Sequence, residues 1–426
     1  MYASFDMPFT LAQQQNKQQV TLTAMLNNLG NPTKWDSLFQ SAVAELRTRH
    51  PDMDINLSYK AFPYNQTRSQ LLAALGNKTP VDLVSIDEIW LGEFAEKGYL
   101  IDLTDRVKSW GRASDWYQTN FAGGVYKGKI YGIWTFTDLR STWYWKDLLN
   151  KAGVDPNMLK TWDSYIASLK KINDTFRGQG QDIQAGNVIC GGAEWYQYLW
   201  ELGGDVLVQK DGHPIKGTYW FPAYNSSAGV RALEFYKDQI NAGVKPLLSN
   251  VSGMDRDFVN KKYAVFIGGS GLPGIFPPEQ RKDLDKRIGF IPIVPVPNQN
   301  TQTATLLGGW EFGIPTTSKN KDLAWELLTI MLEPKVISPW LQQTGLIPTQ
   351  KTVGSGPELA QLNQTIPYYS EMISEVPFGR SRPNIPQFAQ IDEQVSHALD
   401  QVCSGVKEPK QALDEAAAKS AKLLGW

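Results

Sequence analysis

Residues 81–86 read VDLVSI, and Asp87 and Glu88 follow them directly. This apolar run is typical of a strand that is buried on both faces, and the two carboxylates stand at its carboxyl end. The preceding residues 67–75 have helical spacing and end at Gly76. A helix that leads into a buried strand belongs to a βαβ unit. We therefore expect a parallel sheet, with the two acids at the edge where ligands collect.

The same alternation extends toward the N-terminus. Residues 20–26 form a β-rich run, residues 35–49 place apolar side chains at helical spacing, and residues 54–59 alternate as a second strand. Asn28 belongs to the turn-forming sequence after the first strand, so we expect it on a loop at the carboxyl end of that strand. The Gln-rich residues 1–19 are expected to form a flexible leader.

Strands and helices also alternate toward the C-terminus. We expect short strands at residues 128–134 and 142–145 with a connection between them, a strand at 263–267, and an extended proline-containing segment at 288–297. Helices are expected at residues 162–174, 195–202, 228–242, 252–260 and 323–332, with two more between 396 and 425.

The composition excludes several classes of function. The chain has 426 residues, enough for two or three domains of about 150 residues each. Lys and Arg (42) nearly balance Asp and Glu (43), so there is no basic excess for nucleic acid or for an anionic membrane. No apolar stretch approaches the roughly 20 residues of a transmembrane helix. The three histidines are too scattered for a metal cluster, and we expect no cofactor.

Common motifs of catalysis and redox chemistry are incomplete in this chain. Gly269, Gly271 and Gly274 satisfy GxGxxG, but a proline lies inside the motif and two more would break the helix that must follow it. No P-loop, serine hydrolase or metalloprotease signature is complete. Cys190 and Cys403 belong to no CxxC pair and are either free thiols or one disulfide.

Several carboxylates stand next to aromatic or basic residues, and the chain contains 15 Trp. Ionised carboxylates accept hydrogen bonds from the hydroxyls of a sugar, and indole faces cover the C–H patches of its ring. For any one pair, the simpler explanation is a Trp in the core and an acid in solvent. The groups are Asp87 and Glu88 with Trp90, Asp138 with Arg140, Glu194 with Trp195, and Trp310 with Glu311.

Six segments, four of which contain these residues, follow one another along the chain. They include GNKTPVDLVSIDEIWLGEFAEKGYL within residues 71–104, GKIYGIWTFTDLRSTWYWKDLL within 128–156, GGAEWYQYLWELGG at 191–204, NKKYAVFIGGSG at 260–271, GGWEFGIPTTSKNKDLAWELL at 308–328 and RPNIPQFAQIDEQ within 382–405. In this order the chain, over residues 20–424, resembles the extracellular carbohydrate-binding proteins of ABC importers, the family that includes maltose- and trehalose-binding proteins.

The resemblance implies a two-lobed α/β fold of the periplasmic-binding-protein class, type II-like. Each lobe would be a mixed, mainly parallel sheet flanked by helices, and the ligand would lie in a cleft between hinged lobes. The implied boundaries are 20–137 plus 291–345 for the first lobe, 138–290 plus 346–426 for the second, and crossovers near 136–140, 289–294 and 345–349.

The resemblance also implies which residues contact the ligand. Trp310 and Trp195 would stack on sugar rings, and acidic and Arg side chains would bind the hydroxyls. The family often has a G-x-W sequence where this chain has Gly269, Ser270 and Gly271, so one stacking ring is missing unless Phe276 or Trp310 replaces it. The complete set of implied contacts is Asn28, Asp87, Glu88, Asp138, Arg140, Glu194, Trp195, Gly269, Ser270, Gly309, Trp310, Glu311, Arg380 and Arg382.

The function implied by the resemblance is non-catalytic capture of a disaccharide or small oligosaccharide by hinge closure, followed by delivery to ABC permease subunits. The protein would act as a monomer outside the cytoplasmic membrane, with its signal sequence already removed. Two alternatives remain open. One is a binder of a polyol or glycerophosphodiester, and the other is a secreted glycoside hydrolase, which needs two carboxylates roughly 5 to 9.5 Å apart.

Overall fold

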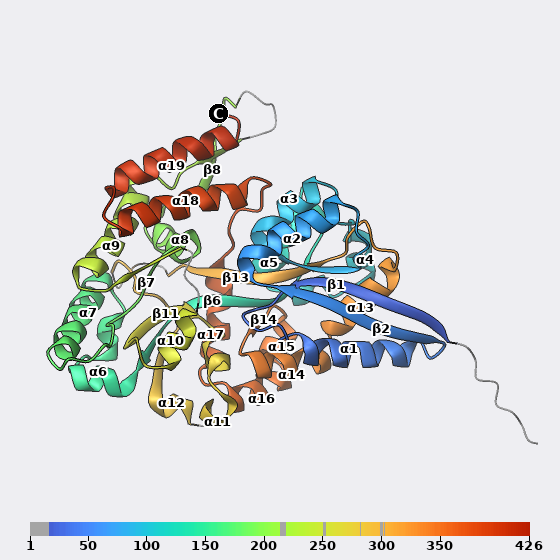
Figure 1. Ribbon diagram of the computed structural model, residues 1–426, viewed down its shortest axis with the longest axis horizontal. Helices are drawn as coiled ribbons and strands as arrows, with labels where there is room; N and C mark the ends of the chain where they lie inside the picture. Colours follow the sequence, from blue (N-terminus) through green and yellow to red (C-terminus); the bar gives the residue numbers. More distant parts are fainter. Residues whose placement is uncertain (1–16, 214–218, 250–252, 282, 299–300, 302) are drawn as a thin grey trace, which may run out of the picture.

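The computed structural model describes residues 17–213, 219–249, 253–281, 283–298, 301 and 303–426. Residues 1–16 of the predicted leader lie outside these ranges, and the first strand begins at Gln18, two residues before the predicted start. The described chain forms two α/β lobes with long strands between them (Figure 1). The two-lobed α/β fold class predicted from the sequence is therefore confirmed. The prediction that the sheets are mainly parallel is wrong, because most strand pairings in the large sheet of the described residues are antiparallel.

Within the described residues, nine strands form one mixed sheet. Its order is β11-β6-β13-β3-β1-β2, and β12 and β14 also pair with β6, whereas β15 pairs with β13. β1 is parallel to β2 and β3, but β13 is antiparallel to both β3 and β6. The strands are β1 (Gln18–Asn27), β2 (Met53–Phe62), β3 (Leu83–Asp87), β6 (Ile133–Trp145), β11 (Val265–Gly269), β12 (Ile288–Ile291), β13 (Thr305–Gly313), β14 (Ile347–Pro348) and β15 (Gly379–Arg380).

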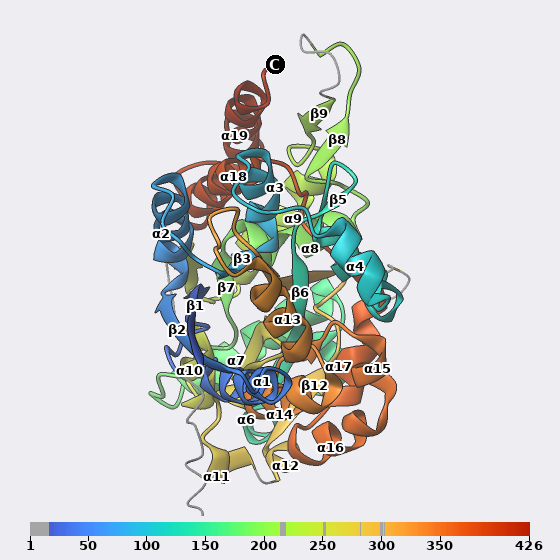
Figure 2. The same ribbon diagram turned by 90° about the vertical axis from the view of Figure 1, so that its right-hand side faces the viewer.

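Three two-stranded sheets complete the described strands. They are β4 (Val125–Tyr126) with β5 (Lys129–Ile130), β7 (Val188–Cys190) with β10 (Pro246–Leu248), and β8 (Leu207–Gln209) with β9 (Trp220–Pro222). The β8–β9 hairpin lies at the same end of the molecule as the C-terminal helix α19 (Pro409–Leu423) (Figure 2).

Helices surround the strands in both lobes. In Figure 1 the right-hand lobe carries α1 (Asp36–Arg49), α2 (Tyr64–Gly76), α3 (Leu91–Glu96), α4 (Thr104–Trp110), α5 (Gln118–Gly123) and α13 (Lys321–Met331). The left-hand lobe carries α6 (Lys146–Ala152), α7 (Trp162–Arg177), α8 (Gly192–Glu201), α9 (Ser227–Asn241), α10 (Met254–Val259), α18 (Phe388–Cys403) and α19. Below the central strands lie α11 (Pro278–Arg281), α12 (Leu284–Arg287), α14 (Pro334–Thr344), α15 (Lys351–Ser355), α16 (Pro357–Thr365) and α17 (Tyr369–Glu375).

Short 3₁₀ helices connect several of these elements. They are η1 (Glu88–Trp90), η2 (Ala113–Asp115), η3 (Pro156–Leu159), η4 (Leu272–Ile275) and η5 (Val376–Phe378). In η1 the Asp87 carboxylate accepts the Ile89 N–H at 3.4 Å, which is the N-cap arrangement that satisfies a free donor at a helix start. The chain therefore turns directly at the end of β3.

Helix α1 forms where the apolar spacing predicts it. Its buried side chains are Leu38, Phe39, Ala42, Val43 and Leu46, which repeat at three- and four-residue intervals. Asp36 lies in its first turn and Arg47 and Arg49 in its last turn, which complements the helix dipole. This face packs against the first lobe's core.

The strand β6 corrects one prediction, because the expected connection at residues 135–141 is part of a single strand. Thr137 and Thr142 are polar and buried, and each donates its hydroxyl at 2.9 Å to a backbone carbonyl of a neighbouring segment, Gly308 and Ile293 respectively. A buried hydroxyl costs little when it is bonded in this way. The polar run therefore resembles a loop in sequence but lies inside the sheet.

The predicted crossover segments all meet on β6. Residues 288–291 pair with its second half at Thr142 to Trp145, and Ile347 and Pro348 pair with its first half at Thr137 and Phe136. The predicted crossovers therefore lie along one strand, with β14 on its first half and β12 on its second half. The lobe boundaries remain a prediction.

An aromatic cluster fixes the loop after β1. Trp35 stacks on Trp340 with ring centroids 5.0 Å apart, and both indoles are fully buried. The Trp35 indole donates to the Asn27 carbonyl and the Trp340 indole to the Lys34 carbonyl, both at 2.7 Å. The two indoles thereby hold both ends of the loop at residues 28–34.

Cys190 and Cys403 form a disulfide, which decides between the two alternatives left open by the sequence. Cys190 ends β7 and Cys403 ends α18, and 213 residues separate them. The bridge therefore ties the C-terminal helix pair to the second lobe.

Candidate functional site

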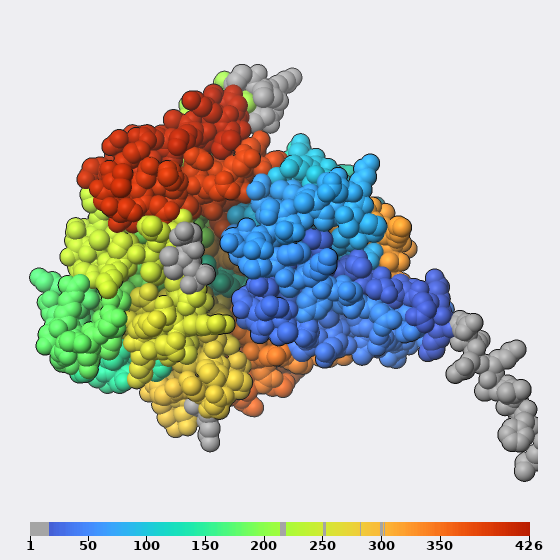
Figure 3. Space-filling model, viewed as in Figure 1, coloured from blue at the N-terminus to red at the C-terminus, as the bar shows by residue number. Residues whose placement is uncertain are grey.

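A groove separates the two lobes on the face shown in Figure 3, between the blue surface and the yellow-green surface. One part of it is a cavity of about 710 Å³ between the loop after β1 and the segment around α10 and α11. Its lining residues come from opposite sides and are Leu29, Gly30, Asn31, Thr33, Lys34, Gly253, Asp255, Arg256, Gly274, Ile275, Pro278, Arg281, Gln343 and Thr344.

Asp87 and Glu88 bind the guanidinium group of Arg382, which is distant in sequence. Arg382 donates through Nε and Nη2 to the two Glu88 oxygens at 2.7 and 2.9 Å, and through Nη2 to Asp87 at 3.1 Å. All three side chains are buried. Burial alone would lower the pKa of Arg382, but the two carboxylates raise it, so the guanidinium stays charged. We call this group the Arg382 cluster.

A second ion-pair group lies on β6 and α8. Arg140 donates through Nη1 to Asp138 at 2.6 and 2.9 Å and through Nε to Glu194 at 2.6 Å. These side chains are partly exposed, and the exposed fraction of the Asp138 side chain is 27%. Burial raises the pKa of Asp138, whereas Arg140 acts in the opposite direction. We call Asp138, Arg140 and Glu194 the Arg140 cluster, and it is the more accessible of the two.

Glycines make room for the Arg140 cluster. Gly269 pairs with Arg140 across β11 and β6, and a Cβ at Gly269 would lie 2.9 Å from an Asp138 oxygen. Gly308 pairs with Asp138 across β13. At Gly309 a Cβ would lie 2.5 Å from the Phe136 carbonyl, closer than any side chain tolerates. The predicted residue Gly269 therefore leaves space for Asp138, whereas Gly309 leaves space for the Phe136 carbonyl and the Trp134 ring.

An aromatic group lies beside the Arg382 cluster. Trp310 is directly opposite Asp87 in the β13–β3 pairing, and its ring packs edge-to-face on Trp90 at 5.5 Å and on Tyr64 at 6.1 Å. Trp310 is only 7% exposed, whereas Tyr64 is 53% exposed. The accessible ring of this group is therefore Tyr64, with Trp310 supporting it from behind.

Two predicted contacts do not face the groove. The Trp195 indole is fully buried, so the prediction that it stacks on a sugar fails in this structure. Successive residues of a helix point about 100° apart, and because Glu194 reaches Arg140, Trp195 turns into the core. Glu311 is likewise fully buried and accepts the indole N–H of Trp134, because neighbours on a strand face opposite sides.

Three other predicted residues have structural partners. Arg380 donates to Asp205 at 3.0 Å, lies over the Trp200 ring and is exposed, so it is Arg382 that reaches the acids. The Asn28 side chain accepts the N–H of Gly30 at 3.0 Å and closes the turn after β1. The Ser270 hydroxyl is buried and accepts the N–H of Leu139 at 3.4 Å.

Glu311 predicts a pH dependence of stability. Burial raises the pKa of Glu311 well above its usual value, so the folded protein holds this proton after the unfolded chain has released it. Stability that depends on Glu311 is therefore greatest below the unfolded pKa of about 4.3 and is lost as the pH rises toward the folded pKa. Glu311→Gln keeps an oxygen for Trp134 and removes the titration. We expect the melting temperature of the variant to fall less than that of the parent between acidic and neutral pH. Equal falls in the two melting temperatures would contradict a titration of Glu311.

The sequence reasoning missed three charged or aromatic residues near the two ion-pair clusters. Tyr64 follows β2 at the start of α2, a position at the carboxyl end of a parallel strand that could have drawn attention to it. Asp392 lies in the first turns of α18 and accepts the Tyr196 hydroxyl at 2.7 Å. Asp255 lines the groove from α10. Burial raises the pKa of Asp255 to about 6, although the positive charge of Arg140 lowers it.

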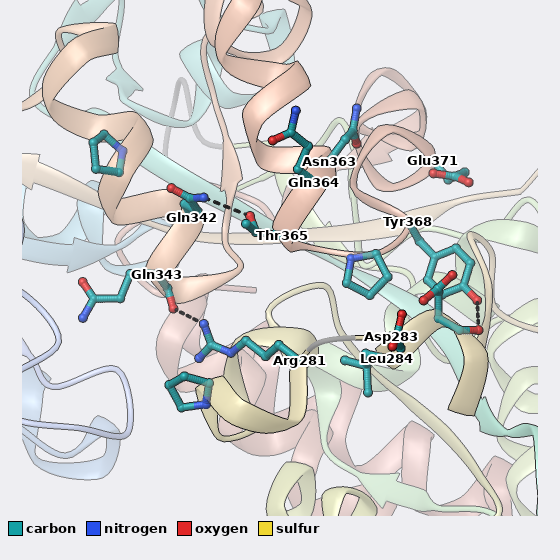
Figure 4. Close-up of a pocket in the computed structure, with 14 residues that line it drawn as sticks. Arg281, Asp283, Leu284, Gln342, Gln343, Asn363, Gln364, Thr365, Tyr368 and Glu371 are labelled. Carbon is teal, nitrogen blue, oxygen red and sulfur yellow. Dashed lines mark hydrogen bonds between the residues drawn. The ribbon is translucent and has the colours of Figure 1, made fainter.

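A separate cavity of about 910 Å³ lies outside the groove, below the central strands (Figure 4). In the figure Arg281 reaches the Gln343 carbonyl at 3.2 Å, and Gln342 donates to Thr365 at 3.1 Å. Arg281 and Gln343 line both cavities, so their hydrogen bond lies where the groove and this outer cavity adjoin.

Over the described ranges, no group of three or more His, Cys, Asp or Glu side chains has an arrangement that could hold a metal ion. No helix in the same part of the chain has the length and hydropathy of a membrane span.

Comparisons with known proteins agree with the two-lobed architecture. The diacetylchitobiose binding protein DasA of Streptomyces coelicolor is 25% identical over 340 residues, covering 79% of this chain and 74% of that protein. An arabinooligosaccharide-binding protein of Bacillus subtilis is 24% identical over 403 residues, covering 90% and 88%. A solved ABC transporter solute-binding protein from Thermotoga lettingae, with alpha-D-tagatose bound, has 25% identity and a TM-score of 0.78, covering 96% of this chain and 100% of that one.

The family described as bacterial extracellular solute-binding protein matches residues 30–337, which is more than half of the chain. Most residues that line the groove cavity lie within this span. This chain belongs to the bacterial extracellular solute-binding protein family.

Proposed function

We propose that this protein is the receptor of an ABC importer for a carbohydrate, of disaccharide size or somewhat larger. The observation that carries the proposal is the groove between the lobes, which Asp255 lines within electrostatic reach of the Arg140 cluster. We place the ligand near this groove, with the Arg140 cluster, the Arg382 cluster and the exposed Tyr64 ring as its contacts. Carboxylates and guanidinium groups bind sugar hydroxyls through charge-assisted hydrogen bonds, and an aromatic ring covers the apolar face of the sugar.

Binding would be coupled to movement of the lobes. A ligand that touches both sides of the groove binds the closed form more tightly than the open form, so it shifts the population toward closure. The closed form is what the permease subunits would recognise. The relatives named above bind a diacetylated amino sugar, arabinooligosaccharides and a monosaccharide by their names, which supports a carbohydrate as the ligand class.

We propose that the protein binds its ligand without catalysis. Family relatives are binding proteins, and both candidate carboxylates of the Arg140 cluster are engaged by one guanidinium. A glycosidase needs one carboxyl that is free to donate a proton to the leaving group. Incubation with disaccharides and detection of released monosaccharide tests this point, and turnover would contradict the receptor function.

Tyr64 provides the test of the groove itself. A thermal-shift screen against mono-, di- and trisaccharides identifies a ligand, because a ligand at 100 times its Kd stabilises the folded state by about 2.7 kcal/mol. We expect Tyr64→Ala to weaken the Kd of that ligand about tenfold, since a lost aromatic contact costs about 1 to 1.5 kcal/mol. Calorimetric titration measures the change.

The control for this variant is Tyr219→Ala, which removes a tyrosine of similar exposure beside the β8–β9 hairpin. It should leave the affinity unchanged. Equal affinities of Tyr64→Ala and the parent would place the ligand elsewhere.

A further inference from the structure

The cavity between the lobes has more cationic than anionic side chains in its lining. The cations are Lys34, Arg256 and Arg281, and Asp255 is the carboxylate that lines it with them. Lys34 belongs to the loop after β1, whereas Arg256 belongs to α10 and Arg281 to α11, so the cations come from both sides of the cavity. One carboxylate cannot offset the charge of all three.

Arg281 has no carboxylate partner among the described residues. It donates instead to three backbone carbonyls at 2.8 to 3.2 Å, those of Gly274, Phe276 and Gln343. These bonds fix the position of the guanidinium without neutralising it. In the Arg140 and Arg382 clusters, by contrast, each guanidinium binds two carboxylates. Arg281 is therefore a positioned cation whose charge is available to a ligand.

The Lys34 amino group is in a similar position. Its side chain is half-buried, and over the described ranges it makes no hydrogen bond or ion pair. Burial lowers the pKa of Lys34, Asp255 raises it, and the charge of Arg281 lowers it again. The Lys34 carbonyl accepts the Trp340 indole, which holds the loop in place. An anion beside this amino group would offset the cost of its partial burial.

Two uncharged residues of the lining also present donors. The Asn31 amide oxygen already accepts both the backbone N–H and the hydroxyl of Thr33, each at 3.1 Å. The Gln343 amide oxygen accepts the Ser37 hydroxyl at 2.7 Å. In each amide the NH₂ group is therefore the part left for a ligand. Ionised carboxylates and phosphates present acceptor oxygens, so they match such a lining.

We propose that this cavity is the subsite for a negatively charged group of the carbohydrate, a carboxylate or a phosphate, held between Lys34 and Arg281. The inference rests on the proposed function and names the ligand class more narrowly. The cavity volume of about 710 Å³ is within the usual range for a ligand site, and a cleft lined by one sign of charge concentrates ligands of the opposite sign. An anion bound there contacts both lobes, with the uncharged part of the ligand toward the Arg140 cluster.

The test compares matched forms of a glucose disaccharide, in both α-1,4 and β-1,4 linkage. The forms carry an alcohol, a carboxylate, a phosphate or an ammonium group at C6 of either ring. Calorimetry measures their affinities at neutral pH. We expect a carboxylate or phosphate form to bind at least fivefold more tightly than the alcohol, and the ammonium form at least fivefold more weakly. The tighter of the two anions identifies the group, and added salt should reduce the preference.

Lys34→Gln identifies the residue responsible. The variant removes one charge and no hydrogen bond recorded in the described part of the chain, so the ratio of anionic to neutral affinity should fall severalfold. Lys34→Arg keeps the charge and should keep most of the ratio. The matched control is Lys245→Gln, which removes an equal charge just before β10, away from the cavity lining. The control should leave the ratio unchanged.

The outcomes separate this inference from the proposed function. If the alcohol binds as tightly as both anionic forms, or if Lys34→Gln and Lys245→Gln give the same ratio as the parent, the anionic subsite is wrong and the receptor function stands. If no form binds and no sugar of the thermal-shift panel stabilises the protein, the carbohydrate function fails and this inference fails with it.

Discussion

Replacing Arg382 with alanine is expected to lower the free energy of unfolding by about 3 to 5 kcal/mol. The substitution leaves Asp87 and Glu88 buried without their shared partner, and an uncompensated buried charge is far more costly than a lost surface pair. Urea denaturation measures the change. The effect should exceed that of any substitution in the Arg140 cluster, because those side chains are partly exposed.

Arg380→Ala is the matched control for Arg382→Ala. Arg380 lies two residues earlier in the chain, and its ion pair with Asp205 is exposed, so its loss should cost about 0 to 1 kcal/mol. If the two variants unfold at the same urea concentration, the Arg382 cluster does not stabilise the groove. Arg382→Lys, which restores one positive charge without the bidentate geometry, should fall between the parent and the alanine variant.

Removal of the disulfide is the other change with a large expected effect. The bridge closes a span of 213 residues, and cross-links over long spans restrict the unfolded chain most. The double variant Cys190→Ala, Cys403→Ala should therefore lose about 2 to 5 kcal/mol of unfolding free energy. Both cysteines are buried, so part of the loss will come from packing at the ends of β7 and α18.

A reductant separates the cross-link from the packing. Dithiothreitol should lower the urea midpoint of the parent protein and leave that of the double variant unchanged. A parent midpoint that does not respond to reduction during unfolding would show that the bridge contributes nothing to stability.

Regular elements with a single dominant pattern were predictable from the sequence. The buried strand β3 and the helix α1 occur where apolar spacing places them, because each buries the side chains that the pattern groups on one face. The middle of β6 was not predictable in this way. Its buried threonines are satisfied by segments that come 150 residues or more later, and no local pattern records such partners.

Local sequence patterns predicted even less of the candidate site. Acid–aromatic pairs adjacent in sequence drew attention to Glu194 with Trp195 and to Trp310 with Glu311, but neighbouring residues in a helix or strand point to different sides. Trp195 therefore lies in the core, and both Trp310 and Glu311 are buried. The contact between Arg382 and Asp87 spans 295 positions and depends on the completed sheet. The resemblance to a family implied both residues as ligand contacts but did not predict that they pair with each other.

The continuity of β6 has a mechanical consequence. A loop between two bodies acts as a loose joint, whereas this strand is hydrogen-bonded to β13 and β14 in its first half and to β11 and β12 in its second half. A rotation of one body against the other must then be absorbed as a change of twist shared over many peptide units, without breaking the ladder. The amide protons of β6 should accordingly exchange slowly with deuterated solvent, with or without ligand, and their protection would report the torsional stiffness of the joint.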